Sequence, residues 1–248
     1  MRTMDIVAVG VSTSGACHEK DEIPNQDSVL VCLHNGFGAI AVADGLGSCA
    51  RSHEGAYRAV RITLDMLEQR CTAGGFMDDP RAIMEQIAFA WKRSFQGMNV
   101  REFDTTLLFA AVCGQSVLAG GIGDGMIQLS AAGHHAIEVL PPRSGFADQT
   151  TSIASEGALA QLAFARFDIE TSHLPFVALL ATDGVSDDVD PCLRPRFASA
   201  VGAKLLANGV DKARSELTGW LQNWITPGST DDRSLAVLAV TNRSEACV

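Results

Sequence analysis

The chain has 248 residues, 47% of them hydrophobic and 19% charged, and its 29 acidic and 19 basic side chains give a formal net charge of −10. The apolar fraction excludes a disordered or fibrous chain, which cannot bury enough surface to offset its ordering entropy. The acidic balance argues against a nucleic-acid binder, because binding phosphates requires clustered Lys and Arg. No linker or repeat divides the sequence, so we predict a single domain over residues 1–248.

Apolar runs near the start of the chain predict strands over residues 6–11, 28–33 and 37–43. His34-Asn35-Gly36 joins the last two runs and predicts a hairpin, because Asn and Gly both tolerate positive φ. Apolar residues then recur at helical spacing from Ala56 to Leu67. The first part of the chain is therefore expected to form three strands followed by a helix.

A second helix is predicted to begin at Asp79-Pro80, where Asp caps the helix and Pro occupies its first position. Strands return over residues 105–112, 116–122 and 126–129. The first two of these are expected to form a hairpin around Gly114-Gln115.

The last part of the chain is mixed. The elements expected there are, in order, a short helix near residues 158–165, a strand over 176–181, two helices over 197–207 and 212–224, and a strand over 235–240. Groups of strands thus alternate with pairs of helices, without regular βαβ order. We therefore predict an α+β fold, a layered sandwich of antiparallel sheets packed against helical pairs.

Cysteine usage and hydropathy bear on the compartment. Seven scattered cysteines without a CxxC pair match neither a disulfide framework nor zinc-ligand spacing, and they indicate reduced, mostly buried thiols. No apolar run is long enough to cross a membrane, and Asp5 interrupts the stretch that a signal peptide would need. We expect a soluble cytoplasmic protein that binds neither membrane nor nucleic acid.

Acidic residues stand where apolar strands begin or end. Asp44, Asp124 and Asp183 each follow a predicted strand and precede a glycine, and Asp27 and Asp231 come just before strands. A single Asp-Gly pair is typical of a plain β-turn, and that alternative stays open for each. Five such ends together favour a cation site, because desolvated like charges repel unless cations neutralise them. An oxygen-only cluster suits Mg²⁺ or Mn²⁺ rather than zinc.

These segments also carry a family resemblance. The matching stretches follow one another along the chain: Pro24-Asn25-Gln26-Asp27-Ser28, Val42-Ala43-Asp44-Gly45-Leu46-Gly47-Ser48, Asp104-Thr105-Thr106-Leu107, Gly121-Ile122-Gly123-Asp124-Gly125, Ala181-Thr182-Asp183-Gly184-Val185 and Thr230-Asp231-Asp232-Arg233-Ser234. Each stretch is weak alone, but the ordered set spans about residues 10–240. The chain resembles the metal-dependent Ser/Thr protein phosphatases of the PP2C (PPM) family, in their compact bacterial form.

The resemblance implies a PP2C-like α-β-β-α sandwich with a binuclear Mn²⁺ or Mg²⁺ centre at one end. Matched by motif, Asp44 would bridge both ions and the Gly45 carbonyl would bind one of them. Asp183 and Asp231 would hold the other ion, and Asp27 would lie close by, through bound water. The implied reaction is hydrolysis of phosphoserine and phosphothreonine by direct attack of a metal-bridging water.

Further roles follow from the same resemblance. Asp124 and Asp187 match positions that hold a third, weaker metal in some members. Thr105 and Thr106 would support the site from the neighbouring strand. His18 is the nearest candidate for an acid that protonates the leaving group, with an exposed loop histidine as the alternative. The implied partner is a phosphorylated protein in bacterial signalling, opposite a Ser/Thr kinase.

The chain departs from the family pattern in two places. Gln26 stands where many members carry a metal-binding Glu, and Glu22 stands where an Arg holds the substrate phosphate. These changes keep a second hypothesis open: a catalytically weak PP2C-like domain that binds phosphoproteins or regulates them. Arg51 and Arg58 could reach the site, although helix-surface arginines are usually solvated. The segment from Phe146 to Thr151 resembles one that lies near the flap beside the site in those phosphatases, which implies substrate positioning, with an ordinary surface loop as the alternative.

Overall fold

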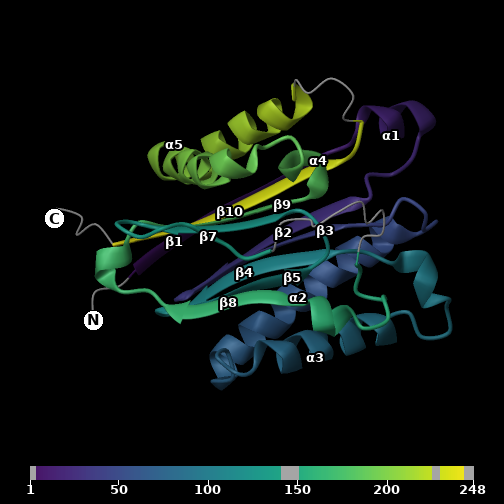
Figure 1. Ribbon diagram of the computed structural model, residues 1–248, viewed down its shortest axis with the longest axis horizontal. Coiled ribbons are helices and arrows are strands. Elements are labelled where there is room, and N and C mark those ends of the chain that lie inside the picture. The colour runs from purple at the N-terminus through teal and green to yellow at the C-terminus, as the bar shows by residue number, and fades with distance from the viewer. Residues whose placement is uncertain (1–3, 141–150, 225–229, 243–248) are drawn as a thin grey trace.

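Two antiparallel sheets are stacked in the middle of the molecule, and helices cover the outer face of each sheet (Figure 1). The computed structural model describes residues 4–140, 151–224 and 230–242. In order across the first sheet lie β1 (Met4–Thr13), β10 (Arg233–Asn242), β9 (Phe176–Ala181), β6 (Met126–Ala131) and β7 (Ile137–Glu138). In order across the second lie β2 (Asp27–His34), β3 (Phe37–Asp44), β4 (Leu107–Cys113), β5 (Ser116–Ile122) and β8 (Ala163–Asp168).

The long helices form the outer layers. The second sheet is covered by α2 (Ser52–Ala73) and α3 (Pro80–Arg93), and the first by α5 (Arg194–Gln222), as Figure 1 shows. Gly209, at φ 74°, divides α5 into two helical segments, so the two helices expected there meet at this residue. The predicted α+β sandwich of two antiparallel sheets and flanking helices is confirmed.

Short helices fill the connections. They are α1 (Ala16–Asp21), α4 (Asp183–Ser186) and the 3₁₀ turns Val100–Phe103, Ala158–Gln161, Thr171–His173 and Pro191–Leu193. Both α1 and α4 lie at the end of the sandwich that is opposite to the chain termini (Figure 1). Among the described residues, no helix combines the length and the apolar character that a membrane span requires.

Strand alternation explains how β3 serves two cores. Ala39, Ala41 and Ala43 pack with α2 and α3, while Ile40 and Val42 point between the two sheets. Because neighbouring residues of a strand face opposite sides, a continuous apolar run is buried on both faces. A third apolar cluster fills the space between the first sheet and α5. The buried strands hold their polar ends in fixed positions at the edge of the sandwich.

Local signals placed the helix and hairpin boundaries correctly. The Asp79 side chain accepts a hydrogen bond from the Arg81 N–H, and Pro80 takes the first helical position of α3. Gly36 turns the β2–β3 hairpin at φ 73°. Residues 105–122 contain the expected hairpin of β4 and β5.

Two sequence-based expectations were wrong. The helix near residues 158–165 is instead a 3₁₀ turn followed by β8, whose partner strand β5 supplies hydrogen bonds that a short local helix cannot match. The thiols are neither all reduced nor mostly buried: Cys71 at the end of α2 is bonded to Cys113 at the end of β4. The free cysteines of the described residues are exposed or partly buried.

Candidate metal centre

Two carboxylates face each other across neighbouring strands. Asp27 begins β2, Asp44 ends β3, and the two are register partners in the antiparallel ladder. Opposed residues on one face lie about 4.5–5.5 Å apart at Cβ, and like charges in that position repel. The strand pairing therefore forces two negative groups together at the end of the second sheet.

Further acidic side chains reach the same place from other segments. Asp124 lies in the turn between β5 and β6, and Asp183 begins α4 directly after β9. One carboxylate oxygen from each of Asp44, Asp124 and Asp183 lies within 4.8 Å of the others. The antiparallel sandwich thus assembles an oxygen-only group from residues up to 139 positions apart in the chain (183 minus 44).

The electrostatic environment of Asp44 is strongly unfavourable for a negative charge. Burial raises the pKa of its carboxyl well above the ordinary value, and the charges of four neighbours raise it further: Asp27, Asp183, Asp231 and Asp124. Each contribution disfavours the ionised form. A bound cation would reverse this effect, because its own charge is the largest in such a site. The charge distribution therefore fits a divalent ion.

Asp27 is buried, with 7% of its surface exposed. Burial raises the pKa of this carboxyl as well, opposed by a hydrogen bond from the Thr182 hydroxyl at 2.8 Å, while the charges of Asp232 and Asp183 raise it further. The same hydroxyl accepts the N–H of Ser234 at 3.0 Å. Thr182 therefore ties the Asp27 carboxylate to the first sheet.

Replacing Thr182 by Val should lower the free energy of unfolding by about 1–3 kcal/mol, because it leaves a buried acceptor and a buried donor unpaired. Thr182→Ser retains the hydroxyl and should recover most of that loss. Urea denaturation of both variants measures the difference. Equal stability of the Val and Ser variants would contradict the role of this hydroxyl.

The backbone of Asp44 is held by the predicted threonine pair. Thr105 donates its hydroxyl to the Asp44 carbonyl at 2.8 Å, and the Thr106 N–H donates to the same carbonyl at 2.8 Å. The Asp44 N–H in turn donates to the Thr106 hydroxyl at 2.9 Å. These bonds fix the carboxylate-bearing residue without using its side chain, so both of its oxygens stay available.

Gly45 is required by close packing. A Cβ at this position would lie 2.7 Å from Ser52 Cβ and 2.8 Å from the Gln26 carbonyl oxygen, much closer than real Cβ atoms come. Its N–H also donates to that carbonyl at 3.1 Å. The Asp44 loop can therefore approach the start of β2 only without a side chain.

Gly45→Ala should destabilise the protein by about 1–3 kcal/mol through overpacking. Gly219→Ala is the matched control, because a Cβ there meets no atom within 4 Å and the residue lies in α5. That control should be neutral or up to about 1 kcal/mol more stable, since Ala favours helix over Gly. Thermal unfolding of the two variants distinguishes them, and similar shifts would refute the packing argument.

Asp232 connects three segments beside the acidic group. This residue is 2% exposed. Its carboxylate accepts the Gly15 N–H at 2.7 Å and the Gln26 N–H at 2.6 Å, and contacts His18 Nδ1 at 2.8 Å. Asp232 therefore anchors α1 and the residue before Asp27 to the start of β10. No role was expected for this residue from the sequence.

The His18 side chain is held in place by Asp232. Its side chain is 17% exposed and its Nδ1 is paired with Asp232, so the alternative of an exposed loop histidine was wrong. A carboxylate at Nδ1 selects the tautomer and orients the ring. Asp232 therefore engages Nδ1 of the ring and not Nε2.

Comparison with known proteins identifies the family of the chain. A family model described as protein phosphatase 2C matches residues 14–222. The chain belongs to the protein phosphatase 2C family. No curated protein sequence gives a significant match.

Solved PP2C structures share the fold at low sequence identity. RsbX in complex with magnesium is 15% identical, with a TM-score of 0.58 over 97% of this chain and 100% of that one. PstP in complex with two manganese ions is 16% identical, with a TM-score of 0.55 over 96% and 100%. PppA, a regulatory component of T6SS in Pseudomonas aeruginosa, is 16% identical, with a TM-score of 0.61 over 94% and 97%.

The other residues expected at the metal centre lie less centrally in the acidic group. Asp231 contributes to the charge around Asp44 but is itself exposed. Asp187 lies one helical turn after Asp183, bonded to its carbonyl through the backbone at 3.0 Å, and is not part of the three-carboxylate group. Glu22 is exposed and ends α1 with a positive φ of 55°.

The two arginines considered for the site are engaged elsewhere. Arg51 pairs with Glu54 at 2.7 Å and lies over the Phe103 ring at 4.5 Å. Arg58 lies over the Phe95 ring at 4.3 Å. Both therefore serve the packing between α2 and its neighbours. Most of the segment expected near the flap, residues 146–150, lies outside the described residues.

Asp104 was given no role from the sequence, yet it fixes the chain after that segment. Its carboxylate accepts the Ser152 hydroxyl at 2.6 Å and the Ala154 N–H at 3.1 Å, and it also accepts the Thr105 N–H at 2.9 Å. Asp104 thus attaches residues 152–154 to the threonine pair that holds Asp44. Its position directly before those threonines was the only available signal.

Proposed function

We propose that this PP2C chain is a Mn²⁺- or Mg²⁺-dependent phosphatase that hydrolyses phosphoserine and phosphothreonine in proteins. The observation that carries the proposal is the group of Asp44, Asp124 and Asp183 oxygens within 4.8 Å of one another. Oxygen donors alone, in a place where negative charge is unfavourable, fit a hard divalent cation better than zinc or copper.

Each acidic residue is assigned to particular ions as a ligand. Asp44 would contact both ions and the Gly45 carbonyl would bind one of them, Asp183 and Asp231 would hold the other ion, and Asp27 would take part through water. Asp124 and Asp187 are assigned to a third, weaker ion. When bound, the ions supply a water activated for in-line attack on phosphorus and offset charge on the phosphoryl oxygens.

The remaining side chains position groups and move protons. Thr182 holds the Asp27 carboxylate, and the threonine pair holds the Asp44 backbone. Asp232 orients His18 through Nδ1. In this proposal His18 acts in its protonated form, in which Asp232 accepts from Nδ1–H and Nε2–H donates its proton to the leaving Ser or Thr oxygen, which would otherwise depart as an unstable alkoxide.

The substrate is proposed to be a phosphorylated protein, opposite a Ser/Thr kinase in bacterial signalling. One second function is favoured by specific residues: a weakly active domain that binds phosphoproteins or regulates them. Gln26 offers less charge to a metal than Glu would, and Glu22 repels phosphate where an Arg would bind it. Both readings share the metal centre and differ in turnover.

Hydrolysis of a phosphothreonine peptide tests the proposal, with Mn²⁺, with Mg²⁺ and with a chelator. Turnover should require the ion and should be lost in Asp183→Asn. Asp211→Asn, an exposed residue of α5, is the control and should retain full activity. Mn²⁺ binding without turnover would favour the regulatory alternative, and turnover that survives chelation would exclude both.

A further inference from the structure

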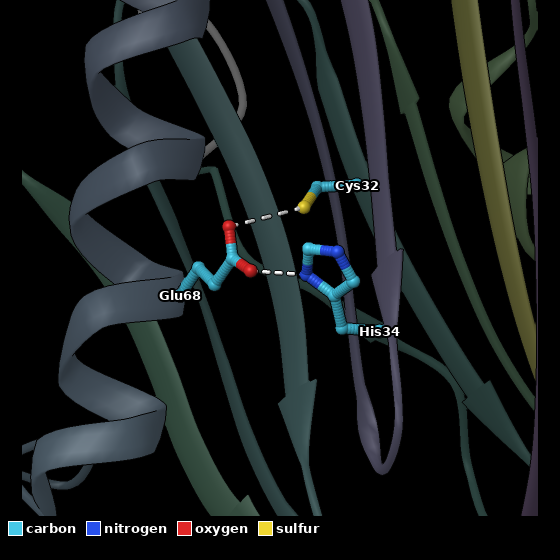
Figure 2. A group of neighbouring side chains, drawn as sticks. All are labelled: Cys32, His34 and Glu68. Carbon is cyan, nitrogen blue, oxygen red and sulfur yellow. Dashed lines mark hydrogen bonds and ion pairs between the residues drawn. The ribbon is translucent and has the colours of Figure 1, made fainter.

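A group of three side chains with mixed chemistry lies outside the acidic centre. Cys32 and His34 come from β2 and Glu68 from α2, and the Glu68 carboxylate faces both the thiol and the imidazole (Figure 2). The Cys32 thiol donates to Glu68 Oε2 at 3.6 Å, and His34 Nδ1 is paired with Glu68 Oε1. One sulfur, one nitrogen and one oxygen all lie within 4.8 Å of one another.

The fold makes this group accessible. Cys32 and His34 are two residues apart, so they project from the same face of β2, the face that α2 crosses. β2 is also an edge strand of its sheet. The side chains of His34 and Glu68 are 65% and 29% exposed, so an ion can reach them from solvent without any rearrangement of the core.

The local charge favours a cation. Among the ion pairs of the described residues, the Glu68 carboxylate pairs with His34 alone, while Arg61 and Asp65 on the same helix pair with each other at 2.9 Å. In the described part of the chain, no Arg or Lys therefore forms an ion pair with Glu68. Burial raises the pKa of the Cys32 thiol to about 11, and the charge of Glu68 contributes to this rise. The thiol therefore keeps its proton when no metal ion is bound.

We propose that Cys32, His34 and Glu68 form a second metal site, the β2–α2 site, which binds a zinc-type divalent ion. Thiolate, imidazole and carboxylate are the three donors that Zn²⁺ prefers, and three protein ligands leave a fourth position for water. Mg²⁺ and Mn²⁺ prefer oxygen alone, so the two sites differ in selectivity. On binding, the Cys32 thiol releases its proton to solvent.

The β2–α2 site is separate from the acidic centre. Cys32 lies five residues beyond Asp27 along β2, a separation of about 16 Å at the usual rise of a strand. A metal there would not touch the aspartates. It would instead link the edge strand β2 to α2, so its expected effect is on stability.

Co²⁺ titration of the whole metal-free chain tests this proposal. Thiolate-to-cobalt charge-transfer absorption in the near ultraviolet should appear when Co²⁺ binds Cys32. The oxygen-only centre cannot produce this absorption, so the signal reports on the β2–α2 site alone. Cys32→Ser should abolish this absorption. Cys17→Ser, Cys49→Ser and Cys192→Ser, which replace the other free cysteines of the described residues, should retain it.

Zn²⁺ competition supplies the second measurement. Zn²⁺ should displace the cobalt signal, and Glu68→Gln, a change of nearly equal size, should weaken binding by at least about 10- to 100-fold, the loss seen when a metal site loses only an outer-shell group. Glu85→Gln on α3 is the matched control and should bind as the wild type does. Absence of the charge-transfer absorption in the wild type, or its persistence in Cys32→Ser, would overturn the proposal and leave an ordinary His–Glu ion pair.

Discussion

Asp44→Asn should reduce metal-dependent phosphatase activity by about 10³-fold or more. The change removes one charge and one ligand from the residue proposed to serve both ions, and the loss of about 4 kcal/mol of transition-state stabilisation corresponds to this factor. The near-equal size of Asn keeps the packing at the end of β3. Initial rates on a phosphothreonine peptide at saturating Mn²⁺ give the measurement, with Asp211→Asn as the control.

In the metal-free protein, the same substitution should not lower the stability of the fold. The pKa of Asp44 is raised in the folded state, so the folded state favours its protonated form. The stability contributed by this group is therefore full at low pH and is lost as pH rises through the raised pKa. Asn remains neutral throughout, so the metal-free variant should be at least as stable as the wild type at neutral pH.

Thermal unfolding with chelator and with Mn²⁺ checks this expectation. Mn²⁺ should raise the melting temperature of the wild type, because ligands that bind only the folded state stabilise it. The shift should be much smaller for Asp44→Asn. A metal-free Asp44→Asn protein that melts well below the metal-free wild type would show that the carboxylate is needed for folding rather than for binding cations.

Asp232→Ala should lower the free energy of unfolding by about 3–5 kcal/mol. The carboxylate is buried and serves three partners, and removing it leaves two backbone N–H groups and an imidazole without an acceptor. Asp232→Asn keeps one acceptor oxygen and should cost about half as much. Urea denaturation of the metal-free proteins measures both changes.

Asp231→Ala is the matched control for this prediction. Asp231 is the adjacent residue and the same amino acid, but it is exposed, and its carboxylate accepts a hydrogen bond from the Asp232 N–H at 2.9 Å. Without metal, its replacement should change stability by less than about 1 kcal/mol. Similar losses for both residues would refute the anchoring role of Asp232.

The contrast between Asp231 and Asp232 shows where sequence reasoning stopped. The motif placed both residues at the beginning of the last strand, and resemblance selected Asp231. Which of two neighbours turns inward depends on strand register, because a shift of one residue exchanges the two faces. The register of β10 is set by β1 and β9, its partners on either side.

Cys32, His34 and Glu68 show the same limit. Cysteine spacing in the sequence matches no zinc motif, since the chain has no CxxC pair. The group forms because α2 crosses β2, which places Glu68 against residues more than thirty positions earlier. The packing of the helix on the sheet brings the three side chains together, and no local pattern in the sequence predicts this contact.

The amino-acid sequence by itself determined where the buried strands of the site end. An apolar run that stops at Asp-Gly marks a buried strand and its turn, because burial needs apolar side chains and a tight turn needs glycine. The convergence of Asp44, Asp124 and Asp183, the inward turn of Asp232 and the pairing of His18 were decided only by the tertiary structure. Those features depend on which strands become neighbours, and that choice is made by the three apolar cores together.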